Sequence, residues 1–283
     1  MTEADFLALL RPLATNPAAR GFLDDAAVLA LSGASNLVLT HDVLVEGVHF
    51  LPSDPANDVA WKLVAVNLSD LAAKGATPLG VLLGFPLGDA DWDARFVSGL
   101  GAALAAFDVP LLGGDTVKGP RVLSLTAVGQ ARIAPSRTGA RAGDGLFVTG
   151  VIGRAGLGLR GDPDHLAAFR RPTPRLVEGQ VLASLVHAMM DVSDGLLIDA
   201  QRMAAASGLA IEIDLDAVPV VGDRMAAITA GDDYELLFAA STGFHPPVAA
   251  TRIGFFSTGE GLTLVDANGA VPLPNRLGWE HGQ

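Results

Sequence analysis

The stretch that organises the rest of the chain is Val66-Asn67-Leu68-Ser69-Asp70-Leu71-Ala72-Ala73-Lys74-Gly75. The residues from 58 onwards have the spacing of a helix, in which each residue advances by about 100°. Asp70 then falls on one stripe with three earlier residues, Val59, Leu63 and Val66. An apolar helix face therefore carries a carboxylate.

The place of Asp70 within this helix does not favour a charge. Gly75 followed by Pro78 predicts a helix end, so Asp70 lies in the last two turns, where the helix dipole disfavours a negative charge. Either Ser69, Asn67 or a backbone group satisfies a buried Asp70, or Asp70 belongs to a functional site. The helix alone leaves both interpretations open.

The composition indicates a globular protein with a large core. The chain has 283 residues, of which 50% are hydrophobic, a length that predicts one large or two medium domains. The apolar stretch 79–87 is interrupted by Gly and Pro and is too short to span a membrane. The acidic start, residues 1–5, lacks the features of a secretory signal, so we expect a cytoplasmic protein. The absence of cysteine excludes disulfides, thiolate metal sites and cysteine nucleophiles.

The charge is strongly acidic. A net charge of −12, from 19 basic and 31 acidic residues, with no run of Lys or Arg, argues against nucleic acid or a membrane as partner. The aspartates recur in short clusters flanked by Gly, Ser or Thr rather than along helix faces. Their positions therefore carry more information than their number.

The periodicity predicts an α/β protein. We expect helices over 4–14 and 91–107, the helix that includes Asp70 with Asn57 as its cap, and strands over 80–86 and 122–130. Small and polar residues at 134–139 interrupt the pattern, so we place a boundary between domains 1–133 and 134–283.

In the first half, acidic residues fall at the ends of predicted strands. Asp24-Asp25 precedes an apolar run, and a strand over 37–40 is expected to open into a loop that contains Asp42 and His49. Gly113-Gly114-Asp115 is expected at another strand end, where two glycines let the backbone approach a ligand closely.

The second half repeats the pattern. Asp191 precedes a helix for which Ser193 or Asp194 is the predicted N-cap, and the pair Asp232-Asp233 precedes an apolar strand. The loop before a helix expected at 176–188 carries three arginines that we expect to be solvated: Arg170, Arg171 and Arg175.

Clusters of carboxylates point to cations. Two carboxylates about 4 Å apart repel by roughly 4 kcal/mol at an effective dielectric constant near 20. Oxygen ligands without Cys select hard ions, Mg²⁺ before Ca²⁺ where phosphates share the coordination. The pattern favours a multi-metal site for phosphoryl transfer from a nucleotide. A phosphatase or pyrophosphatase that uses the same metals, or a non-catalytic protein that binds metal or nucleotide, remains an alternative that spacing by itself does not separate from a kinase.

Six motifs, taken together and in order, resemble the thiamine-monophosphate kinase family over almost the whole chain. They are Asp24-Asp25-Ala26-Ala27-Val28, the segment from Asp42 to Phe50, the segment from Val66 to Ala73, Gly113-Gly114-Asp115-Thr116, Asp191-Val192-Ser193-Asp194-Gly195-Leu196, and Gly231-Asp232-Asp233-Tyr234-Glu235-Leu236. The resemblance implies an N-terminal α/β domain whose strands pair across a homodimer into a β-barrel. It also implies a C-terminal α/β domain, as in the aminoimidazole-ribonucleotide synthetase superfamily.

The resemblance further implies ATP-dependent phosphorylation of thiamine monophosphate to thiamine diphosphate. The residues at the family's Mg²⁺ positions are Asp25, Thr40, His41, Asp42, Asp70, Asp115, Asp191 and Asp194. Those at its nucleotide contacts are Gly114, Asp115, Arg137 and Ser193, and those at its thiamine phosphate contacts are His49, Asp232 and Trp279. Because the acceptor phosphate is already ionised, no general base is expected, and metal-assisted in-line transfer at Asp70, Asp115 and Asp191 suffices.

Three positions depart from the family pattern. His41 stands where the family usually has Ser or Thr, Asp232 where it usually has Glu, and Phe22-Leu23 replaces a Gly-containing approach to the Asp pair. Two related enzymes, selenophosphate synthetase and the hydrogenase-maturation carbamoyl dehydratase, depend on cysteine or selenocysteine, which this chain lacks. Aminoimidazole-ribonucleotide synthetase is the remaining enzymatic alternative.

Overall fold

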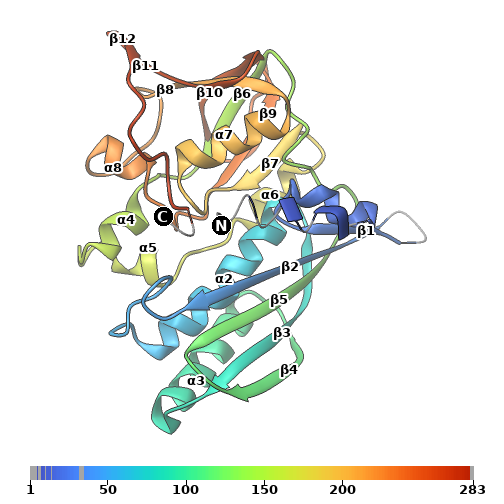
Figure 1. Ribbon diagram of the computed structural model, residues 1–283, viewed down its shortest axis with the longest axis vertical. Helices are drawn as coiled ribbons and strands as arrows, with labels where there is room; N and C mark the ends of the chain where they lie inside the picture. The colour runs from blue at the N-terminus through green and yellow to red at the C-terminus, as the bar shows by residue number, and fades with distance from the viewer. Residues whose placement is uncertain (1–4, 6–7, 10, 14, 32–34, 281–283) are drawn as a thin grey trace.

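The computed structural model describes residues 5, 8–9, 11–13, 15–31 and 35–280 and shows a mixed α/β fold with two mixed sheets (Figure 1). The helices are η1 (Arg11–Leu13), η2 (Pro17–Phe22), α2 (Ala56–Ala73), α3 (Ala90–Ala106), α4 (Arg154–Leu159), α5 (Leu166–Arg170), α6 (Leu176–Leu182), α7 (Leu196–Ala206) and α8 (Arg224–Ile228). The strands are β1 (Ala27–Ala30), β2 (Asn36–Val45), β3 (Thr77–Leu87), β4 (Leu111–Lys118), β5 (Val122–Ala131), β6 (Asp144–Thr149), β7 (Ala188–Asp191), β8 (Leu209–Asp214), β9 (Leu236–Ser241), β10 (Ala250–Thr258), β11 (Gly261–Asp266) and β12 (Gly269–Val271).

The first sheet, at the bottom of Figure 1, has the strand order β1-β2-β5-β3-β4. Its strands are antiparallel except for β3 and β4, which run parallel. Helices α2 and α3 pack together, and α2 lies against β2 and β5. Val59, Leu63 and Val66 belong to the buried core between α2 and this sheet, as their spacing predicts.

Helix α2 ends as predicted but begins differently. Gly75 has φ +58°, a left-handed conformation that a glycine adopts without strain, and it follows the last turn directly. The predicted Asn57 cap is wrong, because Pro55 occupies the N-cap position and no side chain caps the helix. Proline suits a helix start, where free N–H groups have no partner within the helix.

Two acidic motifs of the first half lie within strands rather than in loops. His41 and Asp42 are inside β2, paired with Thr126 and Leu125 of β5, so the expected loop begins only after Val45. Likewise Gly114 and Asp115 lie in the middle of β4, not at its end. The polar side chains of these residues led the sequence analysis to end each strand too early. Strand pairing is made by the backbone, so a strand can continue through polar side chains on an accessible face.

The second sheet, at the top of Figure 1, has the strand order β12-β11-β8-β10-β6-β9-β7. Its one parallel pair among the described strands is β8 with β11. Helix α7 follows β7 and packs against β7, β8 and β11. The C-terminal end of α2 reaches this half, because Ala72 and Ala73 share a buried cluster with Leu236 and Phe238.

The start of α7 corrects a second capping prediction. The N-cap is Gly195, not Ser193 or Asp194. Instead, Oδ2 of the fully buried Asp199 accepts hydrogen bonds from the backbone N–H groups of residues 193, 194 and 195, at 3.1, 3.1 and 3.2 Å. A carboxylate in the first turn of the helix therefore fixes the preceding loop by accepting hydrogen bonds from its backbone.

Part of the predicted helix over 4–14 lies outside the described residues, and Arg11–Leu13 form a 3-10 turn. Of the helices that are described, none has the length and apolar character needed to cross a membrane.

Candidate active site

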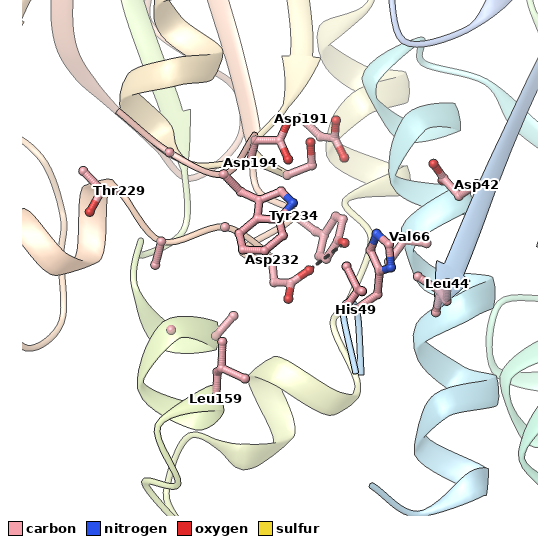
Figure 2. A pocket seen from close by; sticks show the side chains of 18 of the residues that line it. Asp42, Leu44, His49, Val66, Leu159, Asp191, Asp194, Thr229, Asp232 and Tyr234 are labelled. Atoms are coloured by element: carbon pink, nitrogen blue, oxygen red, sulfur yellow. Dashed lines mark hydrogen bonds between the residues drawn. The ribbon is translucent and has the colours of Figure 1, made fainter. Parts of the chain in front are cut away.

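A cavity of about 900 Å³ lies between the two halves of the chain. In Figure 2, Asp191, Asp194 and Asp232 approach it from the second half, while Asp42 and His49 approach it from the first. Nine of the residues predicted for the site line this cavity: His41, Asp42, His49, Asp70, Asp191, Ser193, Asp194, Asp232 and Trp279. Segments up to 238 residues apart in the chain, from His41 to Trp279, are thus brought to one place.

A smaller cavity of about 310 Å³ adjoins the first. It is lined by Asp25 and Thr40, and it shares His41, Asp42 and Asp70 with the larger cavity. The two cavities therefore meet at the strand β2 and the last turns of α2.

The stretch 66–75 contacts two acids of the cavity wall and contributes a third. These three, Asp42, Asp70 and Asp191, are called the acidic cluster below. Asn67 Oδ1 accepts the Asp42 backbone N–H at 3.1 Å, and Ser69 Oγ donates to Asp191 Oδ2 at 2.5 Å. Asp70 itself accepts a hydrogen bond from the Thr40 hydroxyl. One helix end thus joins an acid from β2 to an acid from β7.

Three of these acids have raised pKa values. Burial, followed by repulsion from Asp25, raises the pKa of Asp42 to about 6 and that of Asp191 to about 8. Burial, with repulsion from Asp42 and Asp191, raises the pKa of Asp70 well above its usual range. In the described part of the chain no Lys or Arg forms an ion pair with any of the three. The described basic residues therefore leave a negative charge on any of these three carboxyl groups uncompensated at the cavity wall.

The neighbouring acids Asp24, Asp25 and Asp194 form ion pairs with basic residues. The buried Lys74 ammonium lies 2.5 Å from Asp24 Oδ1 and 3.2 Å from Asp25 Oδ2, and Arg137 lies 3.3 Å from Asp25 Oδ1. Burial alone would raise the pKa of Asp24, but Lys74 and then Arg20 outweigh it and lower that pKa. Asp194 pairs with Arg202 in the same way. The acids of the site that lack a basic partner are therefore Asp42, Asp70 and Asp191.

This donor set fits a hard cation such as Mg²⁺. Among the residues that the structure describes, no three His, Asp or Glu side chains are grouped closely enough to hold a metal ion by themselves. Mg²⁺ usually binds one or two carboxylates and completes its shell with water and substrate phosphates, so it needs no such group. The uncompensated carboxylates and the Thr40 hydroxyl supply ligands of the right kind. His41 is turned toward Thr126, with Nδ1 2.8 Å from its Oγ1.

The residues predicted to hold the acceptor lie on the other side of the larger cavity. His49 Nδ1 accepts the Val45 backbone N–H at 3.0 Å, so a neutral His49 ring carries its proton on Nε2. The Tyr234 hydroxyl donates to Asp232 Oδ1 at 2.9 Å, which Figure 2 shows as a dashed line. Trp279 is half-exposed, and its backbone N–H donates to the Asp194 carbonyl at 2.9 Å.

Three predicted residues line neither cavity: Gly114, Asp115 and Arg137, of which Arg137 is joined to the wall of the smaller cavity by its ion pair with Asp25. Gly114 and Asp115 are exposed on β4, the edge strand, and β5 and β3 separate them from β2. A neighbouring strand is about 4.8 Å away, so three steps across the sheet correspond to roughly 14 Å. Within one chain, Gly114 and Asp115 are not brought to the acidic cluster.

The prediction that the three arginines of the loop before α6 are solvated is wrong, because each pairs with an acid. Arg170 pairs with Asp54 and Arg171 with Asp58, which ties the loop to the first half of the chain. Arg175 makes two hydrogen bonds to the carboxylate of the buried Glu235. These acids are distant in sequence, so no local pattern indicates the pairing.

Sequence reasoning also missed two fully buried lysines on or next to α2, Lys62 and Lys74. A signal was present: Lys62, Val66 and Ser69 follow one another at helical spacing, so a lysine shares the face of α2 that reaches the site. A buried ammonium needs a partner, and both lysines have acidic ones.

Comparisons with known proteins show the family to which the chain belongs. Family models of AIR synthase related proteins match the chain, the N-terminal domain at residues 23–131 and the C-terminal domain at residues 141–270. Fold and site thus define a protein of the AIR synthase related class. Thiamine-monophosphate kinase of Caulobacter vibrioides is 40% identical over 99% of this chain and 91% of that protein. The chain belongs to the thiamine-monophosphate kinase family.

Solved structures of thiamine-monophosphate kinases have the same fold as this chain. The structure described as AaThiL complexed with AMPPCP and TMP has a TM-score of 0.89 and 29% identity, covering 99% of this chain and 97% of that one. The thiamine-monophosphate kinase of Stenotrophomonas maltophilia K279a has a TM-score of 0.77 and 36% identity, covering 92% and 94%.

Proposed function

We propose that this protein transfers the γ-phosphoryl group of ATP to thiamine monophosphate and produces thiamine diphosphate and ADP. The observation that carries the proposal is the convergence of uncompensated acids from both halves with His49, Asp232 and Trp279 on one cavity. Family membership supports the reaction, and one structural neighbour is described as complexed with AMPPCP and TMP.

The chain's own residues then have separate tasks. Asp42, Asp70 and Asp191, with Asp25, Thr40 and Asp194 beside them, would hold Mg²⁺, and the ions would neutralise charge on the phosphates during transfer. Arg137 and the backbone near Ser193 would bind the nucleotide phosphates. His49 and Asp232 would hold the acceptor, with Trp279 stacked on one of its aromatic rings.

The acceptor oxygen belongs to a phosphate that is already ionised near neutral pH, so it needs no general base. The protein's contribution is to position two anionic groups for in-line attack and to exclude water around them. The rigid packing of the α2 end against β2 and β7 serves this positioning, because both strands carry acids of the cluster.

A coupled assay tests the proposal. With ATP, Mg²⁺ and thiamine monophosphate, ADP and thiamine diphosphate should form in equal amounts. ADP release only with another acceptor would assign a different activity, such as that of aminoimidazole-ribonucleotide synthetase. Phosphate release from thiamine monophosphate without ADP would indicate a phosphatase, and nucleotide binding without turnover a non-catalytic protein.

We further propose a homodimer in which the first sheets of two chains pair into a β-barrel. Strand β4 is exposed along its whole length, and it carries Leu111, Leu112 and Val117 at an open sheet edge. Such an edge invites pairing with another strand. If a second copy covers β4, the roles proposed for Gly114 and Asp115 belong to the assembly rather than to one chain.

The division into residues 1–133, for dimerisation and Mg-ATP binding, and 134–283, which completes the site, is part of the same proposal. The first sheet ends at Ala131 and the second begins at Asp144. We also propose that the enzyme acts in the cytoplasm and has neither nucleic acid nor a membrane as partner, in line with its net charge of −12.

A further inference from the structure

Lys62 of α2 is almost completely buried, with 2% of its surface exposed, and lies beside the acceptor side of the cavity. Its ammonium donates to the His49 carbonyl oxygen at 2.9 Å and to Asp232 Oδ2 at 2.8 Å, and it lies 4.0 Å from the centre of the Phe169 ring. A buried ammonium is unfavourable unless its donors are satisfied, and these contacts satisfy it.

The two polar partners of Lys62 come from different halves of the chain. His49 lies in the turn after β2, and Asp232 lies in the turn before β9. Both residues line the larger cavity, whereas Lys62 does not. One ammonium behind the wall therefore links two residues that face the acceptor.

The Asp232 turn is held in an unusual backbone conformation. Asp232 has φ +68° and Tyr234 φ +51°, a left-handed region that non-glycine residues rarely adopt. The Asp232 N–H donates to the Ser193 carbonyl at 2.8 Å, and the Tyr234 hydroxyl holds Asp232 Oδ1. With Lys62 on Oδ2, both carboxylate oxygens are fixed, so the direction of the carboxylate is set before any ligand arrives.

We infer that Lys62 is a positioning residue for the acceptor: it fixes the Asp232 carboxylate and the His49 turn relative to each other, and so sets the affinity for thiamine monophosphate. The inference rests on the proposed function. It differs from a role in the core alone, because it assigns the effect of Lys62 to one substrate and to one partner residue.

The test is a double-mutant cycle of Lys62→Gln and Asp232→Asn, with steady-state kinetics for both substrates. Each single variant should raise the KM for thiamine monophosphate roughly ten- to hundredfold, the loss expected for a hydrogen bond to a charged group. The KM for Mg-ATP should change by less than about threefold. The double variant should have about the same KM for thiamine monophosphate as Asp232→Asn alone, because Lys62 acts through Asp232.

Lys74→Met is the matched control, because it removes another buried, acid-paired ammonium near the same helix but on the Asp24 and Asp25 side. It should raise the KM for Mg-ATP and leave that for thiamine monophosphate nearly unchanged. If Lys62→Gln alone does not fold, the double variant still tests the inference, since replacing both charges leaves neither unpaired: its KM for thiamine monophosphate should equal that of Asp232→Asn, and a clearly higher KM would contradict an action through Asp232.

The experiment distinguishes a failure of the proposed function from a failure of the inference about Lys62. A wild-type protein that makes no thiamine diphosphate would overturn the proposed function. An active wild type would overturn the inference if Lys62→Gln left the KM for thiamine monophosphate unchanged, or if the effects of the two substitutions simply added.

Discussion

The raised pKa of Asp191 leads to a quantitative prediction about the metal-free protein. Asp191 is 3% exposed, and burial followed by repulsion from Asp25 raises its pKa from 3.8 to about 8. Between these values the folded protein holds a proton that the unfolded chain has lost. Stability contributed by Asp191 is therefore complete below pH 4, falls as the pH rises through this window, and is lost above about pH 8.

Asp191→Asn removes that dependence. A pKa difference of about 4 units corresponds to at most about 6 kcal/mol. Water and counterions in the cavity reduce it, so we expect the variant to be about 2 to 4 kcal/mol more stable than wild type at pH 9 in EDTA. At pH 5, only about one unit above the pKa of 3.8, the difference should shrink to about 1 kcal/mol, because most of the window up to pH 8 is not yet crossed and a protonated Asp offers Ser69 the same acceptor as an Asn.

Mg²⁺ should make wild type more stable than Asp191→Asn, the reverse of the order expected in EDTA. At a concentration 100-fold above its dissociation constant, a bound ion adds about 2.7 kcal/mol to the stability of wild type. The variant lacks one ligand and should gain much less. Urea unfolding followed by circular dichroism, at pH 5 and pH 9 and with EDTA or Mg²⁺, measures all eight free energies. A variant that is less stable than wild type by the same amount in every condition would refute the reasoning, because Asp191 would then be an ordinary buried acceptor.

Three further outcomes are expected. Asp70→Asn should lower kcat by about a hundredfold or more in the coupled assay while leaving the metal-free melting temperature unchanged or higher, because it removes a repelled charge; unchanged turnover would remove Asp70 from the site. Arg175→Met should destabilise the fold by about 3 kcal/mol in urea, since it leaves the Glu235 carboxylate buried without its cation; a change below about 0.5 kcal/mol would contradict this. Trp279→Ala should raise the KM for thiamine monophosphate by roughly five- to thirtyfold and leave the KM for ATP unchanged, if stacking holds the acceptor; equal changes in both would argue for a purely structural role.

Much of the first half of the fold could be predicted from local patterns. The α2 stripe, its end at Gly75 and the strands β3 and β5 all follow from periodicity and from glycine and proline signals, which act within a few residues. From the residues alone, the convergence of Asp42, Asp70 and Asp191 could be anticipated only as a chemical need for cations, and it was the family resemblance that named all three as Mg²⁺ positions. Their meeting depends on two sheets and one helix, and spacing along the chain carries no information about it.

The missed features share a different physical cause. The ion pair of the buried Lys62 with Asp232 joins residues 170 positions apart, and although helical spacing places Lys62 on the face of α2 that reaches the site, no local pattern identifies its partner. The predicted caps failed for a related reason. Asp199 replaces Ser193 and Asp194 as the acceptor for backbone N–H groups, and only the three-dimensional turn brings its carboxylate in front of them.

Helix α2 explains why charge and apolar character coexist in the stretch around Asp70. Most of the helix is buried, because one side packs on the first sheet and its end enters the second half. A helix buried on all sides can carry polar groups only where each finds a partner. Lys62, Asn67 and Ser69 find theirs in Asp232, Asp42 and Asp191. Asp70 receives only the Thr40 hydroxyl and no basic group among the described residues, so its charge is the one that α2 leaves for a cation to balance.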